Sequence, residues 1–351
     1  MRPLAAASYR QATPPHPARE RGCDAIGSDD RNQPLSRFTE VVRLARYRSR
    51  EESHVGVIIG DQVVAVQHLN LDLPDDIPAI LAGGLPRLDL IRRAIDGTAR
   101  RDALDEVELL APIPRPAKFL GAGMNYTSHA AELRAPATPS PEFTAAVAAI
   151  RHLNSAYPHS PVPVVFNKQT SCIAGPHDEI WAPFDAKSLD YEGELAIVIG
   201  RRGRRLDVEE AADVIAGYTV TNDISVREWQ NYNGLVWPGK SFETHGPTGP
   251  WVVTTEELEV DALSVRTWVN DELRQDGSTS DWVLGPAELV SVISQLCTLE
   301  PGDLIATGTP GGVAIVDGRY LVPGDRVRVE IEGIGAIDNL VVEEPRDAST
   351  V

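Results

Sequence analysis

Residues 189–200 read LDYEGELAIVIG, an acidic cluster that runs directly into an unbroken apolar segment. A short apolar run such as 195–199 is typical of a strand that is buried on both faces. Glu192 and Glu194 therefore stand at the mouth of a buried strand. Since carboxylates are seldom buried unless they are paired or bind a metal, the stretch predicts a cation or an ionic partner beside them.

Glu192 and Glu194 are two residues apart, so on an extended strand both side chains leave the same face, with Cα atoms roughly 6–7 Å apart. That spacing suits two carboxylates that bind one hard cation, and Asp223, which ends the next predicted strand, could supply a third oxygen. An all-oxygen ligand set favours Mg2+ or Mn2+ over zinc. A solvated strand end with ordinary surface acids stays open as an alternative.

The composition limits the classes of protein. The chain has 351 residues, 42% hydrophobic and 24% charged, so it can form a large ordinary core. Its net charge of −18 argues against nucleic acid as a partner, because phosphate binding requires a basic face. The same charge would repel an anionic substrate unless a cation or local Arg and Lys residues receive it. No apolar run approaches the roughly 18 residues of a membrane span, so no membrane partner is predicted.

The cysteines and the first residues bear on the compartment. Cys23, Cys172 and Cys297 are scattered and show no CxxC spacing, which indicates a reducing compartment, and we predict a cytoplasmic protein. Residues 1–40 are rich in Ala, Pro and Arg without periodicity, so they predict a flexible tail. Their arginines leave a transit peptide open as an alternative.

Many short strands and few helices predict a mainly β protein of the α+β class, built as a β-sandwich or a barrel-like roll. Two hairpins are expected, one in 54–66 that turns at Gly60-Asp61 and one in 264–275 that turns at Asn270-Asp271. Apolar runs and alternation predict further strands at 162–166, 195–200, 217–223, 250–254 and 326–333.

Three helices and one boundary complete the expected organisation. A helix is predicted at 87–95, a second after the capping signal Asp207-x-x-Glu210, and a third along the stripe Leu289, Val292, Ile293 and Leu296. The Pro-rich connector 111–118 divides a small N-terminal α/β domain, 41–112, from a larger catalytic domain, 113–345. Residues 134–161 form a Pro-, Ala- and Ser-rich insert, expected to be a lid or a disordered loop.

Other residues could carry chemistry. His129 and Glu132 stand three apart in NYTSHAAEL, so in a helix the carboxylate would orient the imidazole as a general base. Lys240 in PGKSFETHGP is expected in a loop, where it could stabilise an enolate or carboxylate oxygen. Thr309 in ATGTPGG offers a hydroxyl to an anion. The alternative for His129 and Glu132 is an ordinary i, i+3 pair on the surface. The alternative for Lys240 is a solvated side chain.

Six motifs together resemble the fumarylacetoacetate hydrolase (FAH) family in order and spacing over about 118–342, namely GMNYTSHAAEL, LDYEGELAIVIG, TNDISVREWQ, GKSFETHGPTGPW, WVNDELRQDGSTSDW and LEPGDLIATGTPGGV. The resemblance implies a mixed β-roll or β-sandwich catalytic core that binds Mg2+ or Mn2+. It implies Glu192, Glu194 and Asp223 as metal ligands and His129 with Glu132 as the base dyad. It also implies that the substrate's carboxylate and oxo oxygens are held by Arg227, Gln230, Lys240 and Thr309.

The resemblance favours a hydrolase that cleaves a C–C bond in acylpyruvate-like or fumarylacetoacetate-like 1,3-dicarbonyl 2-oxo acids. One alternative keeps the site and changes the reaction, to an isomerase or decarboxylase of hydroxymuconate-type diacids or oxaloacetate in aromatic catabolism. Another is a non-catalytic protein that binds metal and a 2-oxo acid. The insert at 134–161 is longer than the expected short lid, which leaves substrate size and reaction type open. We further predict that the protein is a homodimer. Its expected ligand is a small-molecule 2-oxo or dicarbonyl acid.

Overall fold

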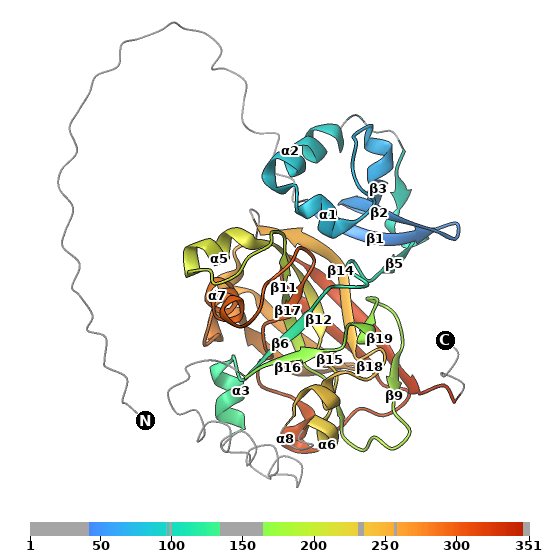
Figure 1. Cartoon of the computed structure of the whole chain (residues 1–351). Helices are drawn as coiled ribbons and strands as arrows, with labels where there is room; N and C mark the ends of the chain where they lie inside the picture. The colour runs from blue at the N-terminus through green and yellow to red at the C-terminus, as the bar shows by residue number, and fades with distance from the viewer. Residues whose placement is uncertain are drawn as a thin grey trace, which may run out of the picture. The chain divides into compact units, whose positions relative to one another are not determined.

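The chain folds as a mixed α/β structure in which strands predominate, as the sequence predicts, and the sheets formed by the described residues are not closed into a barrel (Figure 1). The computed structural model describes residues 42–346 apart from 96, 98–99, 134–163, 231–234 and 256–257. The predicted tail at 1–40 and the predicted insert at 134–161 therefore lie outside the described residues.

Within the described residues the largest sheet has 12 strands, ten of them in the order β4-β3-β2-β1-β14-β12-β11-β17-β6-β7. In the same sheet β5 pairs with β1, and β8 pairs with β14. The strands are β1 (Arg43–Ser49), β2 (Glu52–Ile59), β3 (Gln62–Ala65), β4 (Asp102–Ala103), β5 (Glu108–Leu110), β6 (Phe119–Gly123), β7 (Val164–Lys168), β8 (Ile173–Ala174), β11 (Gly193–Ile199), β12 (Ile215–Asn222), β14 (Gly246–Thr254) and β17 (Leu304–Ala306).

A second sheet, in the order β16-β15-β18-β19-β9, packs on the first, and a short third sheet pairs β10 with β13. Their strands are β9 (Ile180–Ala182), β10 (Leu189–Asp190), β13 (Ser225–Val226), β15 (Ser264–Val269), β16 (Glu272–Ser278), β18 (Arg326–Ile331) and β19 (Gly335–Glu343). Both predicted hairpins are confirmed, because Ile59 pairs with Gln62 and Val269 pairs with Glu272 across two-residue turns.

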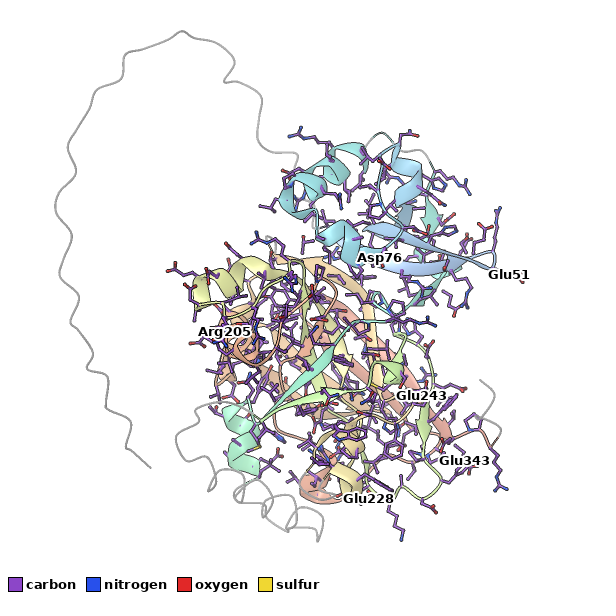
Figure 2. All side chains as sticks on the ribbon, viewed as in Figure 1. Glu51, Asp76, Arg205, Glu228, Glu243 and Glu343 are labelled. Carbon is purple, nitrogen blue, oxygen red and sulfur yellow. The ribbon has the colours of Figure 1, made fainter. Side chains whose placement is uncertain are left out.

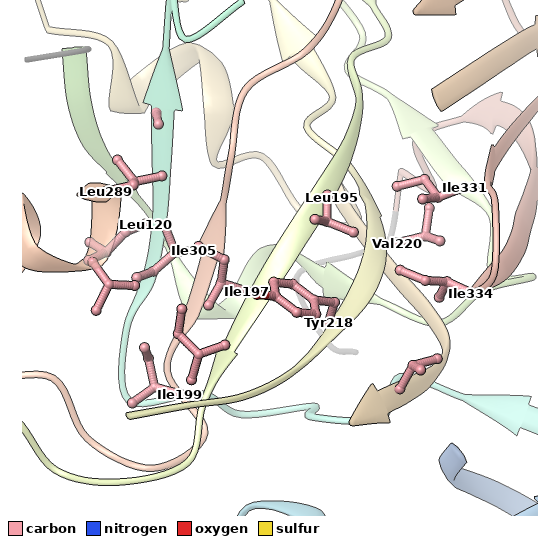
Figure 3. Close-up of a cluster of buried hydrophobic side chains, with 14 of the residues drawn as sticks. Leu120, Leu195, Ile197, Ile199, Tyr218, Val220, Leu289, Ile305, Ile331 and Ile334 are labelled. Atoms are coloured by element: carbon pink, nitrogen blue, oxygen red, sulfur yellow. The ribbon is translucent and has the colours of Figure 1, made fainter. Parts of the chain in front are cut away.

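Strand β11 lies inside the large sheet, and every one of its residues is buried. Leu195, Ile197 and Ile199 point into a core shared with the second sheet and with α7 (Figure 3). Val198, on the opposite face, belongs to a second core that it shares with the N-terminal strands and helices. Two cores on two faces explain why this strand is apolar without alternation.

Gly193 brings the second sheet close to the start of β11. A Cβ atom at this position would lie 2.3 Å from the Thr267 hydroxyl oxygen on β15 and 2.9 Å from a Val329 methyl on β18. Both neighbours are buried and short, so they could not move aside. The glycine between Glu192 and Glu194 therefore permits the close contact between the second sheet and the start of β11.

The N-terminal strands continue the large sheet, since β1 pairs with β14 through Arg43–Val253 and Leu44–Val252. All the described residues belong to one compact unit. The division into a small domain at 41–112 and a catalytic domain at 113–345 remains a prediction.

The helices cover the sheets rather than form layers of their own. Asp207 and Glu210 form the predicted capping box of α5. Leu296 is expected on the buried stripe of α7 but is exposed, and Val290 is buried in the core instead. None of the described helices is long and apolar enough to cross a membrane. The helices are α1 (Ile77–Leu81), α2 (Gly84–Ile95), α3 (Thr127–Glu132), α5 (Val208–Val214), α6 (Arg227–Gln230), α7 (Pro286–Leu296) and α8 (Ala314–Asp317), with 3-10 turns η1 (Val66–Leu69), η2 (Leu104–Glu106), η3 (Thr170–Cys172), η5 (Trp237–Lys240), η7 (Val260–Ala262) and η8 (Thr279–Asp281).

Candidate metal centre and active site

Three carboxylates meet at the mouth of β11. Glu192, Glu194 and Asp223 are all buried, and one oxygen from each lies within 4.8 Å of the others. Pairing of Gly193 with Asn222 brings the two strand ends together, and the Asp223 N–H donates to the Glu192 carbonyl at 2.8 Å. Exposed acids such as Glu51, Glu228 and Glu343 lie instead at the outer edge of the molecule (Figure 2). A solvated strand end is therefore excluded for the cluster.

Three cationic side chains contact two of these carboxylates. Lys240 Nζ lies 2.6 Å from a Glu192 oxygen and 2.8 Å from an Asp223 oxygen. Arg227 lies 2.6 Å from Glu192, and Lys168 lies 2.6 Å from Asp223. Lys240 stands at the end of η5 and is buried, so the expectation of a loop lysine is wrong in its local structure. The reason is that Trp237–Lys240 closes a 3-10 turn with Pro238 near its start.

Glu194 differs from its neighbours because, among the described residues, no cationic side chain forms an ion pair with it. It accepts a hydrogen bond from the Gly308 N–H at 2.7 Å. Burial, together with the charges of Asp223 and Glu192, raises the pKa of Glu194 well above its usual range. Burial would also raise the pKa of Glu192, but Lys240 and Arg227 outweigh it and hold that pKa below its usual range. Glu194 is therefore the carboxyl group of this cluster whose ionised form the protein stabilises least.

The donor set fits a hard divalent cation. Arg227 also pairs with Asp190 at 2.7 Å, so the cluster has four carboxyl groups and three cationic side chains, and Glu194 is the carboxyl group left without a cation among the described residues. A divalent ion would relieve the repulsion at Glu194 and turn the cluster positive, which an anionic substrate requires. Carboxylate oxygens are the ligands that Mg2+ and Mn2+ prefer.

The predicted base dyad lies on α3, which confirms the helical spacing of His129 and Glu132. His129 Nδ1 is 3.8 Å from a Glu132 oxygen, and this buried nitrogen has no hydrogen-bond partner within the part of the chain that the structure describes. The Gly312 N–H donates to both Glu132 oxygens, at 3.1 and 3.0 Å. The loop 308–312 joins the two groups, because its Gly308 N–H donates to Glu194 and its Gly312 N–H donates to Glu132, and His129 contributes to lowering the pKa of Glu192. The two predicted groups of residues thus belong to one site.

The predicted substrate-binding residues are already bonded to the protein. Arg227 donates to the Gln230 side-chain oxygen at 2.8 Å as well as to its carboxylates. The Thr309 hydroxyl donates to the Gly193 carbonyl at 3.0 Å and accepts from Gln275 at 2.8 Å. Their roles toward a substrate remain predictions, and any direct contact would require these bonds to be shared or exchanged.

Sequence reasoning missed three buried residues of the site. Lys168 ends β7 and holds Asp223, while Asp190 holds Arg227 and accepts the N–H groups of Ala314 and Ile315. Gln275 accepts the Gly193 N–H at 3.0 Å. A lysine that ends an apolar strand and a third acid in LDYEGE were the available signals.

His245, next to this site, predicts a pH-dependent stability. Burial lowers the pKa of His245 to about 3, and its Nε2–H donates to the Trp181 carbonyl at 2.9 Å. The unfolded chain takes up this proton below about pH 6.5 while the fold resists it. Stability is therefore complete above that pH and falls between about 6.5 and 3, by about 2 kcal/mol at pH 5. Urea unfolding should show that the free energy of unfolding falls less between pH 7 and pH 5 in His245→Gln than in the wild type. An equal fall in both proteins would show that His245 is not the group responsible.

Comparison with known proteins agrees with this geometry. Residues 118–342 match the family model described as fumarylacetoacetate (FAA) hydrolase C-terminal, which spans most of the chain and the whole site. The chain belongs to the fumarylacetoacetate hydrolase family. Oxaloacetate tautomerase Fahd2a, mitochondrial, from Rattus norvegicus is 34% identical over 311 residues, which cover 86% of this chain and 92% of that protein.

Two solved structures of FAH-family relatives show the same fold. 5-Carboxymethyl-2-hydroxymuconate delta-isomerase from Mycobacterium smegmatis is 32% identical, with a TM-score of 0.65 over 87% of this chain and 100% of its own. Maleylpyruvate hydrolase from Sphingobium sp. SYK-6, in complex with manganese(II) ion and pyruvate, is 30% identical, with a TM-score of 0.67 over 86% and 100%. The relatives thus carry tautomerase, isomerase and hydrolase names.

Proposed function

We propose that the protein is a Mg2+- or Mn2+-dependent enzyme that interconverts the keto and enol forms of a small 2-oxo diacid of the oxaloacetate type. The observation that carries this proposal is the buried cluster of Glu192, Glu194 and Asp223, in which Glu194 has no cationic partner among the described residues and which loop 308–312 joins to the dyad of His129 and Glu132. This reaction belongs to the isomerase alternative that the motifs left open, and the name of the rat relative supports it over hydrolysis.

A bound divalent cation would supply Lewis acidity that stabilises negative charge on the oxo oxygen of the substrate. Glu192, Glu194 and Asp223 would hold it. Lys240, fixed between Glu192 and Asp223, places a positive charge beside the same oxygen. The pyruvate and manganese in the Sphingobium structure support a 2-oxo acid as the ligand.

The proton transfer falls to His129. Its Nδ1 faces Glu132, which leaves Nε2 free to remove a proton from the carbon next to the oxo group or to return it. Glu132 cannot turn away easily, because the Gly312 N–H bonds both its oxygens. The dyad also argues against a non-catalytic binding protein, which would need the three carboxylates alone.

Hydrolysis of a C–C bond is the second candidate, and the same dyad supports it. With a 1,3-dicarbonyl acid, His129 Nε2 would accept a proton from water as the water attacks the distal carbonyl. The departing fragment is again an enolate beside Lys240. The relation to the Sphingobium maleylpyruvate hydrolase favours this reaction, which was the first expectation from the sequence.

Product analysis distinguishes these reactions. The Mn2+-loaded protein would be incubated with enol-oxaloacetate, an acylpyruvate and a hydroxymuconate-type diacid, and the products followed by ultraviolet absorbance and NMR. Faster loss of the enol band without release of carbon dioxide or a second acid is expected. Cleavage of the acylpyruvate with no effect on the enol band would replace the proposal by hydrolysis, and carbon dioxide release would replace it by decarboxylation.

A further inference from the structure

Helix α3 carries both residues of the dyad, yet its own sequence does little to hold it. The helix has six residues, and its N-cap residue Tyr126 makes no side-chain capping bond. Isolated helices shorter than about 12 residues are marginal in water. The position of His129 must therefore be set by contacts from elsewhere in the chain.

Asp281 supplies such a contact at the first turn. One of its carboxylate oxygens accepts the Ser128 N–H at 2.8 Å, and the other accepts the Thr127 hydroxyl. Ser128 directly precedes His129 and belongs to the first turn, whose N–H groups have no partner inside the helix. Asp281 thus performs the function of an N-cap residue from the end of η8, 153 positions away in the sequence.

The residues that follow Asp281 extend this attachment to the metal centre. The Val283 N–H donates to the Asn125 carbonyl at 2.8 Å, and the Leu284 N–H donates to the Asn125 side-chain oxygen at 2.9 Å. The side-chain amide of Asn125 donates to the Thr307 carbonyl at 2.8 Å. Since Gly308, which bonds Glu194, follows Thr307, one chain of hydrogen bonds joins α3 to the carboxylate cluster.

Asp281 is the residue of this hydrogen-bond network that can be substituted without leaving a cavity in the core. Asn125 is buried and makes three side-chain bonds, whereas Asp281 is only partly buried and lines a cavity of about 460 Å³. Glu132 and Asp276 line the same cavity. Asp276 pairs with Arg266 at the surface and, among the described residues, forms no hydrogen bond or ion pair with α3, so it is a matched control.

We propose that Asp281 is a positioning residue that fixes the position of the His129 imidazole by capping α3 from outside the helix. The proposal deepens the proposed function, since it rests on His129 as the base. A displacement of about 1 Å between a catalytic group and its substrate can cost a factor of about 100 in rate. Loss of the remote cap is therefore expected to appear in turnover, because α3 would no longer be held at its first turn.

The kinetic test compares Asp281→Ala, Asp281→Asn and Asp276→Ala in the Mn2+-loaded protein. Asp281→Ala should lower kcat about 10- to 100-fold with KM and Mn2+ affinity near those of the wild type. Asp281→Asn should restore most of kcat, because its side-chain oxygen still accepts the Ser128 N–H. Asp276→Ala should behave as the wild type. A loss in Asp281→Asn as large as in Asp281→Ala would overturn the proposal, since the charge rather than the cap would then matter.

A double-mutant cycle tests whether Asp281 acts through His129. In a His129→Ala background, Asp281→Ala should cause no further loss of kcat, because there is no imidazole left to position. A full additional loss would overturn the proposal.

Hydrogen exchange gives a readout that does not depend on the reaction. Exchange over 127–133 should be faster in Asp281→Ala than in the wild type and unchanged in Asp276→Ala. If His129→Ala retains full turnover, the proposed function fails in its base while the exchange result still decides whether Asp281 holds α3. Unchanged exchange in Asp281→Ala would overturn the anchor itself.

Discussion

Glu194→Gln should abolish binding of Mg2+ or Mn2+ and remove activity, while the metal-free protein should be as stable as the wild type or more stable. Glu194 is the carboxylate without a cationic partner among the described residues, and burial with two neighbouring acids raises its pKa. Its ionised form is therefore disfavoured in the metal-free fold at neutral pH, and Gln removes that penalty. Loss of a residue that only hydrogen-bonds a metal ligand lowers metal affinity about 10- to 100-fold. Loss of the ligand itself should therefore lower metal affinity more than about 100-fold.

Glu192→Gln is the matched control, because it removes an equivalent ligand with the opposite effect on the metal-free fold. Glu192 pairs with both Lys240 and Arg227, so its replacement leaves two buried cations with fewer partners. Breaking a buried ion pair costs about 3–5 kcal/mol. We expect the lower end of that range, since Lys240 keeps Asp223 and Arg227 keeps Asp190.

Thermal unfolding with EDTA and with excess Mn2+ measures both effects. Wild type should gain stability with Mn2+, both variants should lose that gain, and only Glu192→Gln should melt earlier in EDTA. Wild-type turnover should also disappear in EDTA. A Glu194→Gln protein that keeps its Mn2+-dependent gain would show that the ion does not bind at this cluster.

Local chemistry explains which parts of the fold the sequence predicts well. Gly60-Asp61 and Asn270-Asp271 turn within two residues, and the capping box of Asp207 is complete within α5. The side-chain period of a strand places Glu192 and Glu194 on one face. Each of these features depends on residues close in the sequence, so it can be read without knowing the sheet order.

The ion pairs of the site depend instead on the tertiary arrangement. Lys168 and Asp223 are 55 positions apart, and their contact requires the order of strands in the large sheet. Likewise, no local signal shows that Thr309 bonds Gly193 across 116 positions. The motifs could identify the family but not the reaction, because under the proposed mechanisms tautomerisation and hydrolysis would both use a cation, Lys240 and a base at the same enolate.

His129→Ala should lower kcat by about 10²–10⁴-fold, the range typical of a lost general base, while Mn2+ affinity stays near that of the wild type. His129 is not part of the candidate metal group found among the described residues and stands on a separate helix, so its loss should leave the three carboxylates in place. Glu132→Gln should cause a smaller loss, because Gln still accepts the Gly312 N–H through one oxygen but no longer stabilises the imidazolium. His177→Ala, at an exposed histidine, is the control and should keep full activity.

The two candidate reactions make different demands on His129, so the same variant separates them. In tautomerisation the imidazole moves a proton at carbon, and exchange of that hydrogen with solvent deuterium should slow by the same factor as kcat. In hydrolysis the imidazole acts on water, so His129→Ala should lose cleavage while exchange at the carbon next to the oxo group, which does not use the imidazole, should stay unchanged. Equal losses of exchange and turnover would support the tautomerase. Full turnover in His129→Ala would contradict both mechanisms and leave the catalytic proton transfer to a group outside the dyad.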